Sequence, residues 1–133
     1  MYKKIMVAID DKNTSRGALR EAENIANSYN GTICIVHAVS SDSGDKLSAT
    51  DLLAQAETSV DALSIETQLI TAAAEYGSEG ISAAIAAAAG EWGADLVVVG
   101  TANRRGLDSF VMGSVAERLV SKVKSSILLV RPE

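Results

Sequence analysis

The stretch GTANRRGLDSFVMGSVAERL, residues 100–119, combines residue types that suit the binding of phosphate. Gly100, Gly106 and Gly113 permit left-handed turns and a close approach of the backbone to a ligand. Arg104 and Arg105 add positive charge. We therefore predict a phosphate-binding loop here. The alternative is a long connection between a strand and a helix, in which the glycines serve only as turns.

A helix start follows this loop directly. Ser114 and Glu117 have the S-x-x-E spacing of a capping box, which predicts that a helix begins at Ser114. The first N–H groups of such a helix are unpaired, and its dipole favours an anion. The Ser114 hydroxyl has one proton, so it can donate to a phosphate oxygen or cap its own helix but cannot fully do both.

Three further side chains could carry chemistry. Asp10 ends the apolar run MVAID, where a carboxylate could bind a sugar hydroxyl or help to hold a divalent cation beside phosphates; a turn or capping role is the alternative. The single histidine, His37, lies in an apolar run without a second ligand at metal spacing, so we interpret it as a core residue. The single cysteine, Cys34, is interpreted as a buried thiol.

Composition excludes several classes of protein. The 133 residues carry a net charge of -5, which argues against a general binder of nucleic acid or of acidic membranes. The apolar segments are too short for a signal peptide or a membrane span, so we expect a cytoplasmic protein. The P-loop, the G-x-G-x-x-G dinucleotide motif, the G-x-S-x-G elbow and a zinc-ligand cluster are all absent from the sequence.

Alternating elements must position these residues. Apolar runs rich in β-branched residues predict strands at KIMVAI (4–9), TICIVHAV (32–39), IETQLITA (65–72), DLVVV (95–99) and SILLV (126–130). Helical spacing predicts helices at about 14–29, 48–63 and 78–91, and a fourth from residue 114. This alternation is typical of one α/β domain over residues 1–133, a three-layer α/β/α fold around a mainly parallel sheet.

The helix boundaries and buried faces follow from local signals. Tyr29 falls on the apolar stripe of the first helix, and Gly31 punctuates before the next strand. Ser48, with Asp51 three residues later, predicts the start of the second helix, and Leu63 would close its buried face. Gly93 is the predicted C-terminal cap of the third helix.

Taken together, these residues resemble the nucleotide-binding branch of the universal stress protein family. That branch has the motif G-x2-G-x9-G-[ST], matched here by Gly100, then Asn103 in place of the second glycine, then Gly113 and Ser114. VAID, IVHAV, Val115-Ala116-Glu117-Arg118 and the closing ILLVRP also resemble the family.

The resemblance implies a five-stranded sheet in the order 3-2-1-4-5 and a site for ATP or AMP, with Mg²⁺ or Mn²⁺ held by the phosphates near Asp10. It also implies a homodimer that pairs through the last strand, SSILLV. The adenine would lie near backbone of the first two strands, and the ribose and phosphates near the residues after the fourth. The predicted nucleotide-binding residues are Ala8, Ile9, Asp10, Ala38, Val99, Gly100, Thr101, Asn103, Arg104, Gly113, Ser114, Val115 and Ala116.

Asn103 is the departure from the motif. If its position needs a positive φ, Asn is the next most tolerable residue after Gly and costs about 1 kcal/mol. If phosphate oxygens pass over the missing side chain, Asn would crowd them and leave room for a monophosphate at most.

Three hypotheses for function follow. The first is a dimeric stress-response module that binds adenine nucleotide and has, at most, slow ATP hydrolysis. The second is a dimeric interaction protein that has lost nucleotide binding, with Asn103 as the mark of the loss. The third is a phosphoacceptor receiver domain, which the absence of an aspartate in ITAAAEYG disfavours.

Overall fold

The computed structural model of the chain describes residues 1–10, 14–41, 46–73, 76–101 and 114–131. Strands and helices alternate along it: β1 (Lys4–Ala8), α1 (Thr14–Tyr29), β2 (Thr32–Ser40), α2 (Lys46–Ser59), β3 (Ser64–Ala72), α3 (Gly77–Trp92), β4 (Leu96–Gly100), α4 (Ser114–Lys122) and β5 (Ser126–Val130). The predicted alternation of strands and helices is confirmed, and α1 and the start of α4 agree with the predicted residues.

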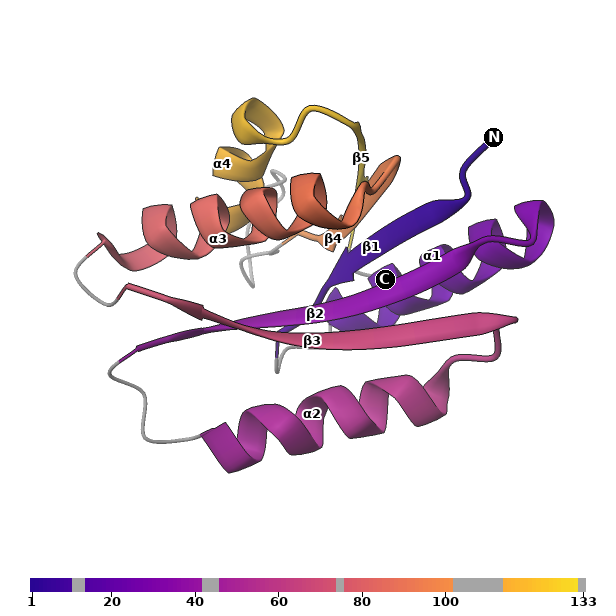
Figure 1. Cartoon of the computed structure of the whole chain (residues 1–133), viewed down its shortest axis with the longest axis horizontal. Coiled ribbons are helices and arrows are strands. Elements are labelled where there is room, and N and C mark those ends of the chain that lie inside the picture. The colour runs from indigo at the N-terminus through magenta and orange to yellow at the C-terminus, as the bar shows by residue number, and fades with distance from the viewer. Residues whose placement is uncertain (11–13, 42–45, 74–75, 102–113, 132–133) are drawn as a thin grey trace, which may run out of the picture.

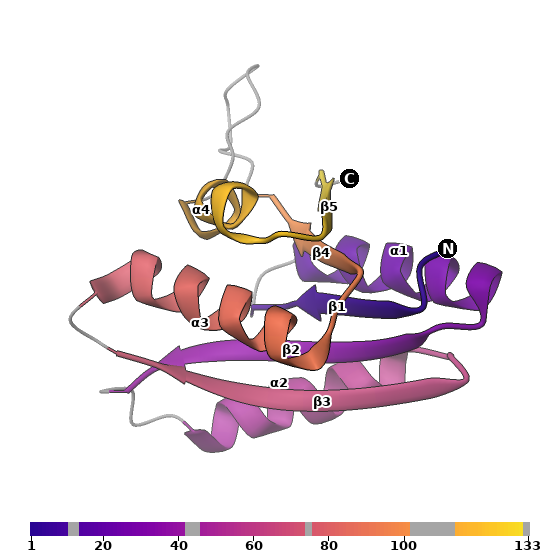
Figure 2. The same ribbon diagram turned by 45° about the horizontal axis from the view of Figure 1, so that its top comes forward.

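Within the described residues, five strands form one parallel sheet in the order β3-β2-β1-β4-β5. Strand β1 pairs with β2 on one side, Lys4 opposite Thr32, and with β4 on the other, Ile5 opposite Leu96. Each pair of strands that follow one another in the chain is joined through a helix, because parallel neighbours need a crossover connection. Figures 1 and 2 show α2 on one face of the sheet and α3 and α4 on the other.

The core has two halves, one on each face of the sheet, because successive side chains of a strand point in opposite directions. From β1, Ile5 and Val7 pack toward α1 and α2, while Met6 packs toward α3 and α4. Cys34 belongs to the second half and is 2% exposed, which confirms the predicted buried thiol.

Two helices end in left-handed residues. Asn30 has a φ of 54° at the end of α1, and the N–H of Gly31 donates to the Ala26 carbonyl. Gly31 itself is needed for space, because a Cβ there would lie 3.0 Å from the Lys3 carbonyl oxygen. At the end of α3, Gly93 has a φ of 82°, which confirms the predicted cap.

Two expectations about α2 are wrong. The helix begins at Lys46, so Ser48 lies inside its first turn and does not start it. Ala49, Leu53 and Ala56, which are spaced four and three residues apart, are buried on one face of the helix. The helix ends at Ser59, and Leu63, now in the connection to β3, is 78% exposed.

The assignment of Tyr29 to the buried stripe of α1 is also wrong. Its side chain is 38% exposed and lies at the edge of the fold, where its ring meets the Tyr2 ring edge to face at 6.1 Å. Three alanines of the same helix, Ala18, Ala22 and Ala26, are buried against the sheet.

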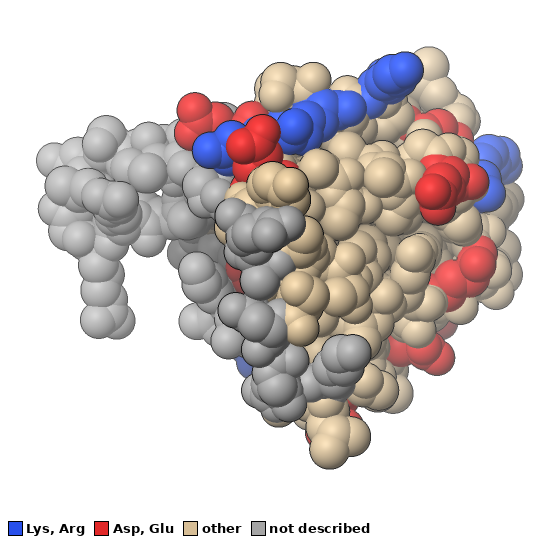
Figure 3. Space-filling model, turned by 60° about the vertical axis from the view of Figure 1, so that its left-hand side comes forward, with Lys and Arg blue, Asp and Glu red and all other residues tan. Residues whose placement is uncertain are grey.

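The side of the molecule where β2 and β3 end is largely uncharged wherever the structure describes it. Figure 3 shows a broad area there without charged side chains, with Lys, Arg, Asp and Glu near its margin. Helix α3 begins on this side (Figure 1), and its residues 80–90, GISAAIAAAAG, include no charged residue. No helix in the described ranges is both long and apolar enough to cross a membrane.

Candidate functional site

The sheet has a switch point between β1 and β4, which lie side by side with Ala8 opposite Val99. After β1 the chain turns to α1 on one face, and after β4 it continues to α4 on the other. In open parallel sheets the crevice beyond such a pair of carboxyl ends is the usual place for a ligand. The residues predicted to bind nucleotide were assigned to the carboxyl ends of these strands.

Five of the described members of the predicted set lie together on the α3–α4 face of the sheet. Ala8, Ala38 and Val99 come from three neighbouring strands, and Val115 and Ala116 come from the first turn of α4; all five pack in one cluster. Gly100 continues β4 opposite Val130. The fold therefore brings residues far apart in the sequence to one end of β1, β2 and β4.

Ile9 differs from this group, because its side chain packs on the α1–α2 face. Its N–H donates to the Val36 carbonyl at 2.9 Å, and its carbonyl oxygen lies 2.8 Å from Nδ1 of His37. A carbonyl oxygen can only accept, so the His37 Nδ1 carries the proton. The half-buried His37 thus holds the end of β1.

Asp10 is held by the first turn of α1. The Ser15 hydroxyl donates to Oδ1 of Asp10 at 2.9 Å, and the backbone N–H of Asp10 donates to Oγ of Ser15 at 2.8 Å. Ser15 is only 8% exposed, so this reciprocal pair is well shielded from water. The pair fixes the direction of the Asp10 carboxylate, and both the predicted binding role and the turn or capping alternative remain compatible with this geometry.

Thr101 has a structural contact that sequence reasoning did not anticipate. Its side chain is fully buried, and its N–H and hydroxyl both donate to the Val130 carbonyl, at 2.9 and 3.2 Å. These bonds prolong the pairing of β4 with β5. Of the remaining predicted residues, Ser114 begins α4, and Asn103, Arg104 and Gly113 lie outside the described residues. Their roles in binding stay predictions.

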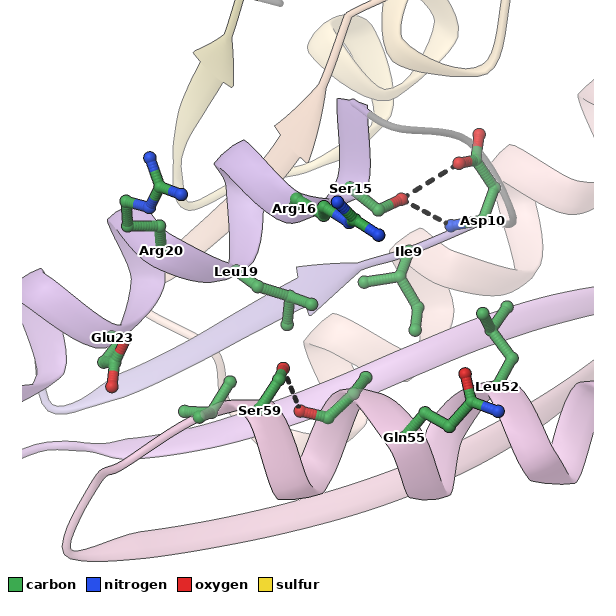
Figure 4. A pocket seen from close by; sticks show the side chains of 12 residues that line it. Ile9, Asp10, Ser15, Arg16, Leu19, Arg20, Glu23, Leu52, Gln55 and Ser59 are labelled. Atoms are coloured by element: carbon green, nitrogen blue, oxygen red, sulfur yellow. Dashed lines mark hydrogen bonds between the residues drawn. The ribbon is translucent and has the colours of Figure 1, made fainter. Parts of the chain in front are cut away.

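A groove of about 590 Å³ lies between α1 and α2, beginning at Ile9 and Asp10. Figure 4 shows Leu19 from α1 and Leu52 from α2 pointing into it, with Ile9 at its base. We call this cavity the α1–α2 groove. Sequence reasoning missed it, because helical spacing predicts which side of each helix is buried but not the space left between two helices.

The described part of the chain contains no group of three His, Cys, Asp or Glu side chains that could hold a metal ion. Among the described residues, Asp10 is the carboxylate that we predicted to lie near the phosphates of a bound nucleotide. Cys34 offers no reactive thiol, because burial, with a smaller contribution from Glu66, raises its pKa from 9.0 to about 11.

Comparison with known proteins agrees with this architecture. A model of the Universal stress protein family matches residues 1–131, and the chain belongs to that family. It is 29% identical over 144 residues to a universal stress protein of Methanocaldococcus jannaschii, covering 98% of this chain and 83% of that protein.

Two solved structures carry nucleotides. A universal stress protein in complex with cAMP has a TM-score of 0.76 and 25% identity, covering 99% of this chain and 98% of that one. A universal stress protein from Archaeoglobus fulgidus in complex with dAMP has a TM-score of 0.70 and 22% identity, covering 97% and 98%. Both share this fold.

Proposed function

We propose that this universal stress protein binds an adenine nucleotide at the carboxyl ends of β1, β2 and β4 and acts as a nucleotide-dependent dimeric module. The observation that carries the proposal is the switch point. There Ala8, Ala38 and Val99 meet the first turn of α4, beside the fixed carboxylate of Asp10. Open parallel sheets bind their ligands at such crevices.

The ligands of related proteins support the choice of an adenine nucleotide. The relative at 25% identity was solved with cAMP, and the Archaeoglobus fulgidus protein, which shows the fold alone, was solved with dAMP. Both ligands contain adenine and a single phosphate. A monophosphate also fits the reading in which Asn103 crowds a longer phosphate chain.

Each part of the site has a proposed role. Backbone at Ala8, Ile9 and Ala38 receives the adenine, and the Asp10 carboxylate accepts a hydrogen bond from the ribose. The phosphates lie between Gly100 and the start of α4 at Ser114, where the helix dipole favours an anion. Arg104 adds charge, and Mg²⁺ or Mn²⁺, when present, is held by the phosphates near Asp10.

Catalysis is not the main role in this proposal. The chain has one histidine, His37, and its Nδ1 is bound to the Ile9 carbonyl at the end of β1. An in-line attack by water on a phosphate needs a positioned base or orienting group. We therefore expect ATP hydrolysis to be slow at most, and nucleotide occupancy to act as a switch.

Calorimetric titration with ATP, AMP and cAMP, with and without Mg²⁺, tests the proposal. We expect binding of at least one of them, and weaker binding by Asp10→Asn, which removes the negative charge and one of the two acceptor oxygens that the carboxylate offers to a ribose hydroxyl or a cation. Asp51→Asn is the matched control, because Asp51 is an exposed carboxylate on α2. Absence of heat and of thermal stabilisation with all three at millimolar concentration would rule the proposal out.

The variant Asn103→Gly distinguishes the two roles considered for Asn103, a side chain that crowds the phosphates or a tolerated turn residue. If Asn103 crowds the phosphates, the glycine variant binds ATP more tightly while its affinity for AMP changes little. If Asn103 is a tolerated turn residue, the wild type and the glycine variant bind ATP with equal affinity, and likewise AMP. If the wild type binds no nucleotide and the glycine variant binds ATP, the second function, an interaction protein that has lost its nucleotide, is the correct one.

A further inference from the structure

The α1–α2 groove is closed at one end and open at the other. Oε1 of Glu23 accepts a hydrogen bond from the N–H of Asp61 at 2.8 Å, and the Asn27 amide donates to the Asp61 carbonyl at 3.0 Å. These bonds tie α1 to the connection between α2 and β3 and close the far end of the groove. The near end lies at Asp10, where β1 ends.

The floor of the groove is apolar. Ile9, Leu19, Ala56 and Val60 line it, each at most 9% exposed, and Leu52 stands half-buried at its rim. The volume of about 590 Å³ lies within the range of about 300–1,000 Å³ that is usual for sites of small molecules. The shape and lining fit a ligand with an extended apolar body.

Most polar groups of the groove are already bound within the protein. Asp10 and Ser15 bind each other, Glu23 accepts from Asp61, and the Ser59 hydroxyl donates to the Ala56 carbonyl at 2.7 Å. These four groups are therefore partly committed to bonds within the protein itself.

Two donors remain, Arg16 on α1 and Gln55 on α2. Neither side chain makes a hydrogen bond or an ion pair with the part of the chain that the structure describes. Figure 4 shows Arg16 extending over the groove near its open end, whereas Arg20 points away from α2. A guanidinium and an amide beside an apolar floor are complementary to a carboxylate that carries an apolar chain.

We propose that the α1–α2 groove binds a small amphipathic carboxylate, with its anionic end at Arg16 and Gln55 and its apolar chain along the floor toward Glu23. From Ser15 to Glu23, α1 rises about 12 Å, at about 1.5 Å per residue. An extended alkyl chain with C–C bonds of ~1.5 Å covers this length with about ten carbons. The groove shares Ile9 and Asp10 with the proposed nucleotide site, but the proposed contacts of the anion, Arg16 and Gln55, do not belong to that site, so their substitution tests this proposal separately.

Methyl NMR of the full chain with sodium decanoate, kept below its micelle concentration, tests the proposal. We expect the largest shifts at the methyl groups of Ile9, Leu19 and Leu52, and binding tighter than that of octanoate by about tenfold to fifteenfold. Arg16→Gln should weaken decanoate binding by about threefold to tenfold. Lys124→Gln is the matched control, because it removes one exposed positive charge at the other end of the chain.

Decyltrimethylammonium tests the sign of the charge. The wild type should bind this cation more weakly than it binds decanoate. In Arg16→Gln the difference in affinity between the two ligands should be smaller. Gln55 is exposed at the rim, so Gln55→Trp should fill the groove without entering the core. This variant should abolish the methyl shifts caused by decanoate and those caused by decyltrimethylammonium. Shifts centred on Ile127 and Leu129 instead, or equal decanoate affinity in wild type and Arg16→Gln, would overturn the proposal while leaving the nucleotide titration unaffected.

Discussion

At the scale of single residues, Ser15 decides where the Asp10 carboxylate points. It accepts from the Asp10 N–H and donates to the Asp10 side chain, so one hydroxyl satisfies two polar groups at the end of β1. The sequence presents Ser15 as one polar residue among several near the start of a helix. Its role becomes visible only when the start of α1 lies beside the end of β1.

Replacing Ser15 with Ala should lower the free energy of unfolding by about 1–2 kcal/mol, because a shielded N–H and a carboxylate each lose a partner. Urea denaturation measures this loss. Ser28→Ala is the control, since the exposed Ser28 hydroxyl only bonds the Asn24 carbonyl within α1, and it should change stability by less than about 0.5 kcal/mol. Equal effects of the two substitutions would contradict the role given to Ser15.

Cys34 should react slowly with iodoacetamide in the folded protein. Its pKa of about 11, against 9.0 ordinarily, means that the thiolate fraction at pH 8 is lower by about a hundredfold, and burial hinders access further. The alkylation rate should therefore be at least about a hundredfold slower than in the urea-unfolded chain. Since the pKa is raised by folding, the unfolded chain ionises first, and stability should fall as pH rises from 9 toward 11. Similar alkylation rates in both states would show that Cys34 is accessible.

At the scale of elements, the ends of α1 and α3 show which helix boundaries the local sequence can predict. Gly93 was predicted as the cap of α3 and has the left-handed backbone that the role needs. At the end of α1, the left-handed residue is Asn30, and Gly31 serves instead to let the chain pass close to Lys3. The two glycines look alike in the sequence, but one is required for its φ and the other for its size.

Gly93→Ala and Gly90→Ala should have opposite effects on stability. Gly93 has a φ of 82°, so alanine there should cost about 1 kcal/mol. Gly90 lies inside α3, where an added Cβ would meet nothing within 4 Å, so alanine should stabilise the protein by about 0.5–1 kcal/mol. Urea denaturation of both variants checks the pair. Destabilisation by both would show that the surface of α3 at Gly90 is not open.

At the scale of the whole molecule, β5 is an edge strand of the described sheet, and we propose that it pairs with β5 of a second copy. Its residues Ile127 to Val130 are all only half-buried, although they are apolar. The Val130 carbonyl accepts from Thr101, so the backbone groups of Val130 face β4. By the alternation of a strand, the N–H and carbonyl of Leu129 point away from β4, toward a partner strand.

Leu129→Pro should therefore weaken the homodimer, because it removes an outward N–H and keeps the bonds between β4 and β5. Leu129→Ala is the matched control: it loses a similar side-chain contact but keeps that N–H. Sedimentation velocity should show a dimer for wild type and Leu129→Ala, and a shift toward monomer for Leu129→Pro. A wild-type protein that is monomeric at every concentration would rule out this interface.

The sequence by itself determined the strands, three of the four helices to within a residue or two, the order of the sheet through its family resemblance, and the residues grouped at the switch point. These features depend on local periodicity and on motifs whose spacing is short. The buried runs of β1, β2 and β4 are continuous and apolar because both faces of a parallel sheet are covered.

Only the tertiary structure decided the bounds of α2, the exposure of Leu63, the Asp10–Ser15 pair and the α1–α2 groove. Each depends on which side chain of a second element lies opposite, and a helical stripe specifies a buried face without specifying its neighbour.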